Sequence, residues 1–313
     1  RPPRYTLFPY TTLFRSVFAS GYVGNMLLLH ALEDKYSEII TDSMAHPSIL
    51  DGIPRNISRI RFYEHLDTGS LERLLENSKS SHPLIITDGL FALTGEIAPL
   101  DQIYSLAQKF NAILVVDDAH ATGILGGNGR GTPEHFNLDN VPNLFQSETM
   151  SKAFGVYGGF ISATESVINN IRSHSTFYGA STALPPPIVA AAIEAVKIVK
   201  QHPELRLKVH QNARLLRDGV RGMDFLTTNT STPIIPILFE NVQSAKSLSA
   251  YLEEHMIVAP SIDYPVKSDK FIVRITVSAN HTVDQIENLL LTLKKWKAKS
   301  KNRKLIGIVP DKK

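Results

Sequence analysis

The sequence of 313 residues contains no cysteine, and this absence excludes several kinds of chemistry at once. Without thiols the chain has no disulfide bond, no thiolate-bound metal and no cysteine nucleophile. It also lacks any run close to the roughly 18 uninterrupted apolar residues that a membrane-spanning helix requires. We therefore expect a cytoplasmic protein that has no membrane span and no metal centre.

The chain also has little net charge. Its lysines and arginines number 33 and its acidic residues 30, and Arg1, Arg4 and Arg15 alone account for that excess. Proteins that bind nucleic acid normally carry a strongly basic face, so we expect no nucleic-acid partner. The basic segment KKWKAKSKNRK (294–304) is typical of a solvated, frayed C-terminus.

Short apolar runs that end in polar residues alternate with helical patterns over residues 38–163. In the segment 99–110, Leu100, Ile103, Ala107 and Phe110 fall on one helical face. Alternation of this kind predicts an α/β fold with a mostly parallel sheet covered on both faces. Ligands of such sheets bind beyond the carboxyl ends of the strands. The runs are EIITDSMAH (38–46), PLIITDG (83–89), AILVVDDAH (112–120), NLFQSETMSK (143–152) and GGFISA (158–163).

The pattern changes near residue 203, and we expect two domains. The large domain should cover 17–202, and a small C-terminal α+β domain 203–297, followed by a basic tail, 298–313. In the small domain we expect a helix over about 203–220 and a strand over 232–240. A helix over 244–255, strands at MIVAP (256–260) and FIVRITV (271–277), and a last helix over 283–296 should follow.

The first candidate site is AILVVDDAHATG (112–123), in which Asp117 ends a buried strand and His120 follows three residues later. A buried carboxylate is costly unless it meets a cation or several donors. A protonated heterocyclic nitrogen would be such a partner, and His120 could bond an oxygen on the same ring. Alternatively, Asp117 caps the next turn and His120 is an ordinary polar residue. This segment alone does not separate the two interpretations.

The second candidate site is SETMSKAFGVYGGF (147–160), where Lys152 follows three hydroxyl residues, Ser147, Thr149 and Ser151. A Schiff-base lysine needs a lowered pKa, and hydroxyl groups suit an anionic phosphate. A lone loop lysine is usually only solvated, but with Asp117 and His120 upstream the combination indicates a pyridoxal-phosphate site.

Several blocks in consistent order resemble the α-oxoamine synthases, a family of fold-type-I pyridoxal-phosphate enzymes. The resemblance implies a truncated large domain of that fold and a decarboxylating Claisen condensation of an amino acid with an acyl-CoA. The motifs leave both substrates undetermined, and a glycine C-acetyltransferase or a serine palmitoyltransferase-like enzyme is an alternative within the family. The alternative of another class is an inactive truncated fragment that only binds cofactor. The blocks, between Ser20 and about Leu293, are AHPSILDGI, TDGLFALTGEIAPL, VVDDAHATGILGGNGRG, TMSKAFG, YGGF, STALPPP and VRITVSANHT.

Four residues would act on the cofactor ring if the roles of the family are carried over. Lys152 would hold the cofactor as a Schiff base and later remove the α-proton of the substrate. Asp117 would pair with the pyridine nitrogen, and His120 would bond the phenolic oxygen. His46 would stack on the ring face, although a histidine before Pro47 could also simply cap a turn.

Further residues would bind the phosphate and the substrate in the same way. Gly21 and Tyr22 match a phosphate-binding turn at a helix start, and Thr149 would add a hydroxyl. Two more matches, Ser181 and Thr182, imply contact with the phosphate of a partner subunit and so a homodimer with shared sites. Arg274 would bind the amino-acid carboxylate, unless it only forms a structural ion pair.

Three positions of the site depart from, or vary within, the pattern of the family. Asp88 is a cofactor-binding candidate where some members have Glu. Ala92 stands where relatives commonly carry a serine, so one hydrogen bond to the cofactor is expected to be absent. Glu148 replaces a small residue, usually Gly, which we expect to place a carboxylate near the phosphate-binding turn.

The first sixteen residues, RPPRYTLFPYTTLFRS, have three prolines and no period of helix or strand. The part TLFPYTTLFRS is similar to the translation of a widely used sequencing-library adapter. The resemblance to the family also implies a long segment before SGYVGN that is missing here. We therefore interpret residues 1–16 as a sequence artefact at the start of a truncated chain.

Overall fold

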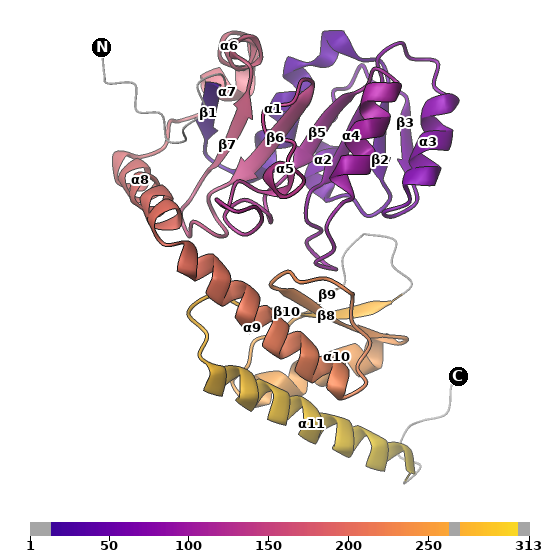
Figure 1. Cartoon of the computed structure of the whole chain (residues 1–313), viewed down its shortest axis with the longest axis vertical. Helices are drawn as coiled ribbons and strands as arrows, with labels where there is room; N and C mark the ends of the chain where they lie inside the picture. The colour runs from indigo at the N-terminus through magenta and orange to yellow at the C-terminus, as the bar shows by residue number, and fades with distance from the viewer. Residues whose placement is uncertain (1–13, 263–269, 306–313) are drawn as a thin grey trace. The chain divides into compact units, whose positions relative to one another are not determined.

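The computed structural model describes residues 14–262 and 270–305. These residues form two compact units, one comprising the chain up to residue 91 together with 97–203, the other 92–96 together with the chain from 204 (Figure 1). Within the described ranges, no helix is long and apolar enough to cross a membrane.

A seven-stranded sheet forms the centre of the first unit, in the order β1-β7-β6-β5-β4-β2-β3. The strands from β6 to β3 in this order pair in parallel, whereas β7 is antiparallel to both β1 and β6. The mostly parallel α/β fold predicted from the sequence is thus confirmed. The bounds are β1 (Phe14–Phe18), β2 (Ile39–Asp42), β3 (Ile60–Tyr63), β4 (Leu84–Asp88), β5 (Ile113–Asp117), β6 (Leu144–Thr149) and β7 (Gly159–Ala163).

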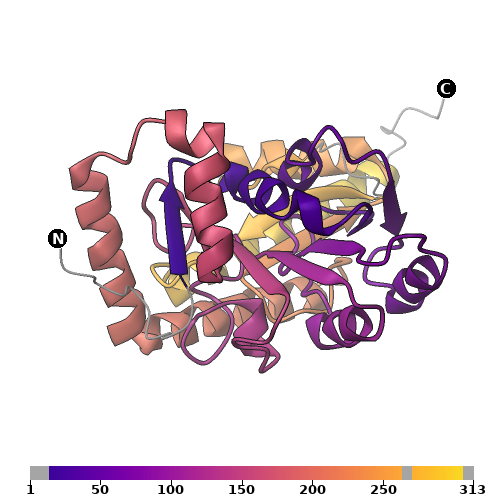
Figure 2. The same cartoon turned by 90° about the horizontal axis from the view of Figure 1, so that it is seen from above.

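Helices cover both faces of this sheet (Figure 2). Every residue of β5 is buried, because alternate side chains enter two different cores: Val115 packs with α1 and α6, and Val116 with α3 and α4. The helices of this unit are η1 (Gly21–Val23), α1 (Gly24–Ala31), η2 (Glu33–Lys35), α2 (Pro47–Asp51), α3 (Thr68–Glu76), α4 (Leu100–Lys109), α5 (Thr132–His135), α6 (Glu165–His174), α7 (Thr176–Ala180) and α8 (Pro186–Gln201).

Strand β1 begins inside the segment that the sequence led us to set aside. Phe14, Arg15 and Ser16 pair with Ala163, Ser162 and Ile161 of β7. Main-chain pairing makes few demands on side-chain identity, so this strand is compatible with either origin of residues 14–16. Residues 1–13 lie outside the described part of the chain.

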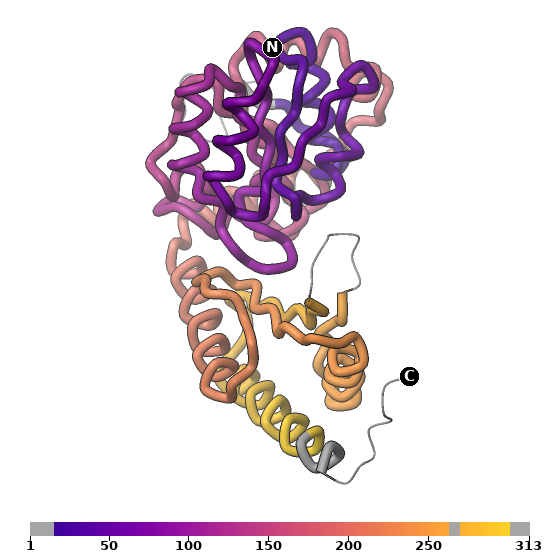
Figure 3. The backbone as a smooth tube through the Cα atoms, turned by 90° about the vertical axis from the view of Figure 1, so that its right-hand side faces the viewer, coloured from indigo at the N-terminus to yellow at the C-terminus, as the bar shows by residue number. Residues whose placement is uncertain are grey.

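The second unit contains an antiparallel sheet in the order β8-β10-β9, packed with three helices. Its core includes Leu216, Ile237, Leu248, Val273 and Leu293, which come from five different elements. Figure 3 lets the reader follow the chain through this unit to α11, drawn in yellow. The bounds are α9 (Pro203–Gly222), β8 (Ile234–Phe239), α10 (Val242–Glu254), β9 (Ser261–Ile262), β10 (Phe271–Thr276) and α11 (Val283–Leu305).

Two expectations for this unit were wrong in detail. The segment MIVAP is not a strand, because Met256 adopts a positive φ of 60° and Val258 is 91% exposed; pairing starts only at Ser261. The last helix does not end at 296 but continues to Leu305, so the first part of the predicted basic tail is helical.

Candidate active site

Four strands of the large sheet end in polar, buried residues at one edge: Asp42 in β2, Asp88 in β4, Asp117 in β5 and Thr149 in β6. Asp88 pairs in register with Asp117. Because the carboxyl ends of parallel strands meet at one edge, these side chains converge there. This edge holds most of the residues that the sequence predicts for the site.

Asp117 is only 7% exposed, and three donors hold its carboxylate. Asn25 Nδ2 donates to Oδ2 over 2.7 Å, and the hydroxyl of Ser48 donates to the same oxygen over 3.3 Å. The main-chain N–H of Ala119 donates to Oδ1 over 3.1 Å, which is the turn contact of the alternative interpretation. Asp117 thus both caps a turn and presents a fixed, buried carboxylate.

His46 is joined to this carboxylate through Ser48. Its Nδ1 accepts from the Ser48 main-chain N–H at 3.2 Å and lies 2.8 Å from the Ser48 hydroxyl, so it also caps α2. Burial lowers the pKa of His46; the nearby negative charge of Asp117 opposes this shift, and the positive charge of Lys152 adds to it. The imidazole is therefore favoured in its neutral form, which suits contact with a flat ring.

Asp88 lies beside His46 and accepts its main-chain N–H over 2.9 Å. Burial raises the pKa of Asp88 well above its usual range, and the charge of Asp117 raises it further, whereas the charge of Lys152 opposes the shift. Protonation of the Asp88 carboxyl is therefore favoured.

Lys152 is exposed on the loop that follows β6. Two hydrogen bonds close the loop, each 2.9 Å long. The N–H of Met150 donates to the carbonyl of Gly158, and the N–H of Val156 donates to the carbonyl of Met150. Its ammonium group acts electrostatically on both His46 and Asp88, which places it at the same sheet edge. His120 is half-buried in the turn after β5.

The predicted phosphate turn meets β6 at very close range. A Cβ on Gly21 would lie 2.6 Å from both Cβ and Oγ1 of Thr149, and a Cβ on Gly159 would lie 2.6 Å from the Cα of Gly21. Ser20 caps the turn by accepting the N–H of Tyr22 over 3.3 Å. Main chain at a helix start beside a threonine hydroxyl forms a cradle that fits a phosphate group.

The remaining predicted residues occupy other parts of the chain. Ser181 and Thr182 are exposed after α7, where the Ser181 hydroxyl donates to the carbonyl of Phe177 over 2.5 Å. Arg274 belongs to β10 in the second unit and donates from Nη1 to the carbonyl of Ala92 over 3.1 Å. Their parts in the site stay predictions.

The expectation that Glu148 places a carboxylate near the phosphate turn was wrong. Successive residues of a strand point to opposite faces, and Thr149 is the one that faces Gly21. Glu148 is buried on the other face, where it accepts from the hydroxyls of Ser162, over 3.0 Å, and Thr122, over 3.3 Å.

Two residues of the network were not predicted from the sequence: Asn25 and Ser48, both partners of Asp117. Each stands inside a quoted block, in SGYVGN and AHPSILDGI, so the motifs were recognised without the function of these members. The available signal for Asn25 was a polar residue directly after Gly24, at the start of an otherwise apolar helical segment.

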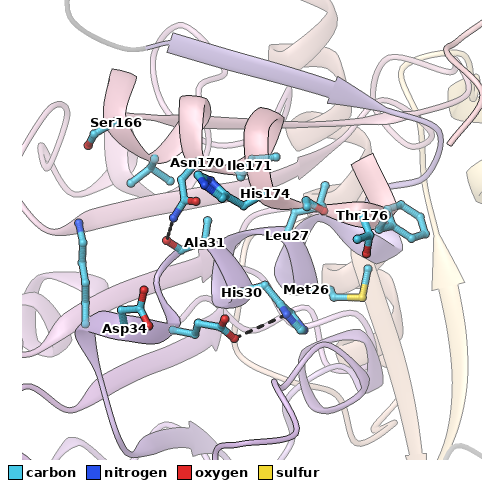
Figure 4. A pocket seen from close by; sticks show the side chains of 15 residues that line it. Met26, Leu27, His30, Ala31, Asp34, Ser166, Asn170, Ile171, His174 and Thr176 are labelled. Atoms are coloured by element: carbon cyan, nitrogen blue, oxygen red, sulfur yellow. Dashed lines mark hydrogen bonds and ion pairs between the residues drawn. The ribbon is translucent and has the colours of Figure 1, made fainter. Parts of the chain in front are cut away.

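A cavity of about 680 Å³ lies elsewhere in the first unit, between α1 with η2 and α6 with α7 (Figure 4). Asn170 Nδ2 donates across it to the carbonyl of Ala31 over 2.8 Å, and His30 Nδ1 lies 3.8 Å from the carboxylate of Glu33. None of the residues that line it belongs to the predicted site. This cavity is therefore separate from the carboxyl edge.

The chain belongs to the family described as aminotransferase class I and II, whose model matches residues 9–293. The match begins inside the segment interpreted as an artefact, and that interpretation stays a prediction.

The curated relatives are more specific. The chain is 38% identical to 8-amino-7-oxononanoate synthase 1 of Bacillus velezensis over 88% of its own length and 70% of the relative. It is 38% identical to 8-amino-7-oxononanoate synthase of Thermoanaerobacter pseudethanolicus, over 89% and 71%. These relatives confirm the resemblance to the α-oxoamine synthases and the expectation of an enzyme.

Solved structures agree with this assignment. A serine palmitoyltransferase from S. paucimobilis with bound PLP superimposes with a TM-score of 0.86 at 27% identity, covering 96% of this chain and 75% of that one. An 8-amino-7-oxononanoate synthase from Francisella tularensis does so with a TM-score of 0.80 at 28% identity, covering 92% and 83%. The predicted fold type and the cofactor, pyridoxal phosphate, are confirmed.

Proposed function

We propose that this chain is an 8-amino-7-oxononanoate synthase, which condenses alanine with a pimeloyl thioester and releases carbon dioxide. The observation that carries this proposal is the identity of 35–38%, over most of the chain, to six proteins of that name and to two named as putative members. The segment STALPPP is also most similar to that branch. Glycine C-acetyltransferase and serine palmitoyltransferase-like activities are not favoured, since these eight curated relatives, at 35–38% identity, are named for neither activity.

The described residues fit the cofactor. The cradle of Gly21, Tyr22 and Thr149 would take its phosphate, and the buried carboxylate of Asp117 would take its ring nitrogen. When bound, pyridoxal phosphate supplies an electron sink for the carbon next to the substrate nitrogen. Asp117 keeps the proton on the ring nitrogen, and Asn25 and Ser48 keep Asp117 in place.

The other residues of the sheet edge bind, orient and transfer protons. Lys152 Nζ would hold the cofactor covalently, and as a free amine it would accept the α-proton of the substrate. The neutral imidazole of His46 would cover one face of the ring and exclude water from it. Asp88 fixes the main chain of His46 by accepting its N–H over 2.9 Å. His120 would bond the phenolic oxygen of the cofactor.

Substrate capture and assembly complete the proposal. Arg274 binds the amino-acid carboxylate through its planar fork of N–H groups. Ser181 and Thr182, which are exposed in the single chain, reach the phosphate of a partner subunit. The enzyme is thus a homodimer with shared sites. It is cytoplasmic and takes an amino acid and an acyl-CoA as substrates.

The cofactor assignment is tested by adding pyridoxal phosphate to the purified chain and recording the visible spectrum. We expect an absorbance band of lysine-bound cofactor that Lys152→Ala abolishes. Lys109→Ala is the matched control, because Lys109 is an exposed lysine paired with Glu72. A band that survives in Lys152→Ala would refute the role of Lys152.

Substrate choice is tested by comparing alanine, glycine and serine, each with a matched acyl-CoA, and measuring carbon dioxide release. The proposal expects alanine with pimeloyl-CoA to be turned over most efficiently. A response to serine alone would overturn the assignment to the oxononanoate branch while leaving the cofactor site intact.

A further inference from the structure

The loop Ala92–Glu96 belongs to the second unit, although the residues on both sides of it belong to the first. It is held there by side-chain hydroxyls from the segment TTNTST (227–232). Thr228 donates to the carbonyl of Thr94 over 2.6 Å, and Thr230 and Thr232 donate to that of Gly95 over 2.9 and 2.7 Å. We call Thr228, Thr230 and Thr232 the threonine clamp.

The clamp fits closely around one residue of the loop. Gly95 has a φ of +69°, and a Cβ there would lie 2.5 Å from the carbonyl oxygen of Ile234 and 2.7 Å from Thr232 Oγ1. Both the backbone conformation and the space require glycine at this position. The path of the loop is therefore fixed by hydrogen bonds and by steric contact together.

Two arginines of α9 donate hydrogen bonds to main-chain carbonyls of the segment that carries the clamp. Arg217 is 2% exposed and donates from Nη2 to the carbonyls of Thr232 and Ile234, over 3.0 and 2.9 Å. Arg221 Nη2 donates to the carbonyl of Thr228 over 3.0 Å. A buried guanidinium bonded to main-chain carbonyls is costly, so its use here indicates a segment whose position matters.

The loop is also bonded to the residue proposed to bind substrate. Arg274 Nη1 donates to the carbonyl of Ala92 over 3.1 Å, at the start of the clamped loop. A guanidinium presents its N–H groups in a rigid plane, so fixing one of them sets the direction of the others.

We propose that the threonine clamp, acting through loop 92–96, positions the Arg274 guanidinium for the carboxylate of the amino-acid substrate. The proposal rests on the proposed function, because it takes Arg274 as the carboxylate-binding residue. The clamp residues are positioning residues, and they act on amino-acid affinity. Cofactor affinity should be independent of them, because the clamp, the loop and Arg274 all lie in the second unit.

The test uses the full chain loaded with pyridoxal phosphate and compares Thr228→Val/Thr232→Val with Thr228→Ser/Thr232→Ser. Valine keeps the branched shape without the hydroxyl, and serine keeps the hydroxyl. We expect alanine to bind about tenfold more weakly to the valine variant, since lost hydrogen bonds of ordinary strength amount to a factor of that order. The serine variant should regain most of this affinity, and the dissociation constant for pyridoxal phosphate should change in neither.

Thr227→Val is the matched control, because the Thr227 hydroxyl is buried in the same segment and has no hydrogen-bond partner. Hydrogen exchange over residues 89–99 reports separately whether the loop is released, and we expect faster exchange only in the valine double variant. Faster exchange with unchanged affinity for alanine would overturn the proposal, as would an equal loss of affinity for cofactor. A failure of the proposed function is distinguishable, because Arg274→Gln would then leave alanine binding unchanged as well.

Discussion

Replacing Gly21 by alanine tests the proposed phosphate cradle at its narrowest point. The added Cβ would lie 2.6 Å from two atoms of the Thr149 side chain, whereas ordinary contacts of a Cβ begin at 3.4 Å. The Thr149 side chain would therefore have to move away from the added Cβ by about 0.8 Å. It cannot do so freely, because β6 is hydrogen-bonded to both β5 and β7.

The magnitude follows from the cost of overpacking. Extra methyl groups in a well-packed region typically cost 1–3 kcal/mol. We therefore expect the free energy of unfolding of Gly21→Ala to fall by about 2 kcal/mol, which corresponds to a decrease in Tm of about 6 °C. Because the clash separates the turn amides from the Thr149 hydroxyl, the affinity for pyridoxal phosphate should fall by about tenfold or more.

The assay combines thermal unfolding without cofactor and titration with pyridoxal phosphate. Gly127→Ala is the control, because a Cβ there has no heavy atom within 4 Å. If Gly21→Ala matched this control in both measurements, the close contact with Thr149 would be refuted. A lower Tm with unchanged cofactor affinity would confirm the packing and refute the phosphate cradle.

Two further predictions concern buried carboxylates. Asn25→Ala removes the 2.7 Å donor of Asp117 and should lower the free energy of unfolding in urea by about 1–3 kcal/mol; an unchanged value would contradict the network. Burial raises the pKa of Asp118 from 3.8 to about 6, so the folded chain binds more protons between these values and stability falls as pH rises through them, levelling off above 6. Asp118→Asn should remove about 3 kcal/mol of this decrease, measured by urea unfolding across that range, and an unaltered pH dependence would contradict it.

Strands β2, β4, β5 and β7 were predicted correctly from short apolar runs, and every residue of each is buried. IITD of β2 and ILVVD of β5 are buried at every residue, so the sequence shows an uninterrupted apolar run. IRFY of β3 was missed because this edge strand buries only Tyr63. An edge strand has one neighbour and less covering, and its composition therefore resembles that of a loop.

The sequence could predict the site residues whose chemistry is evident within one short motif. Asp117 and Lys152 stand in short segments whose residue types already indicate the chemistry. Asn25 and Ser48 contact Asp117 across 92 and 69 residues of sequence, and only the folded sheet brings them together. The distance between motif and partner, more than the burial of the partner, limited the prediction.

The orientation of Glu148 could have been predicted, and it explains why the departure from the family pattern is tolerated. If Thr149 faces the phosphate turn, alternation along β6 directs Glu148 to the opposite face. There its carboxylate accepts the hydroxyls of Ser162 and Thr122. A glycine at this position would remove the acceptor that Ser162 bonds over 3.0 Å, and a buried hydroxyl without a partner is costly. Glu148, Thr122 and Ser162 therefore form a hydrogen-bonded set that supports the turn after Asp117, on the face of β6 opposite Gly21 and the predicted phosphate turn.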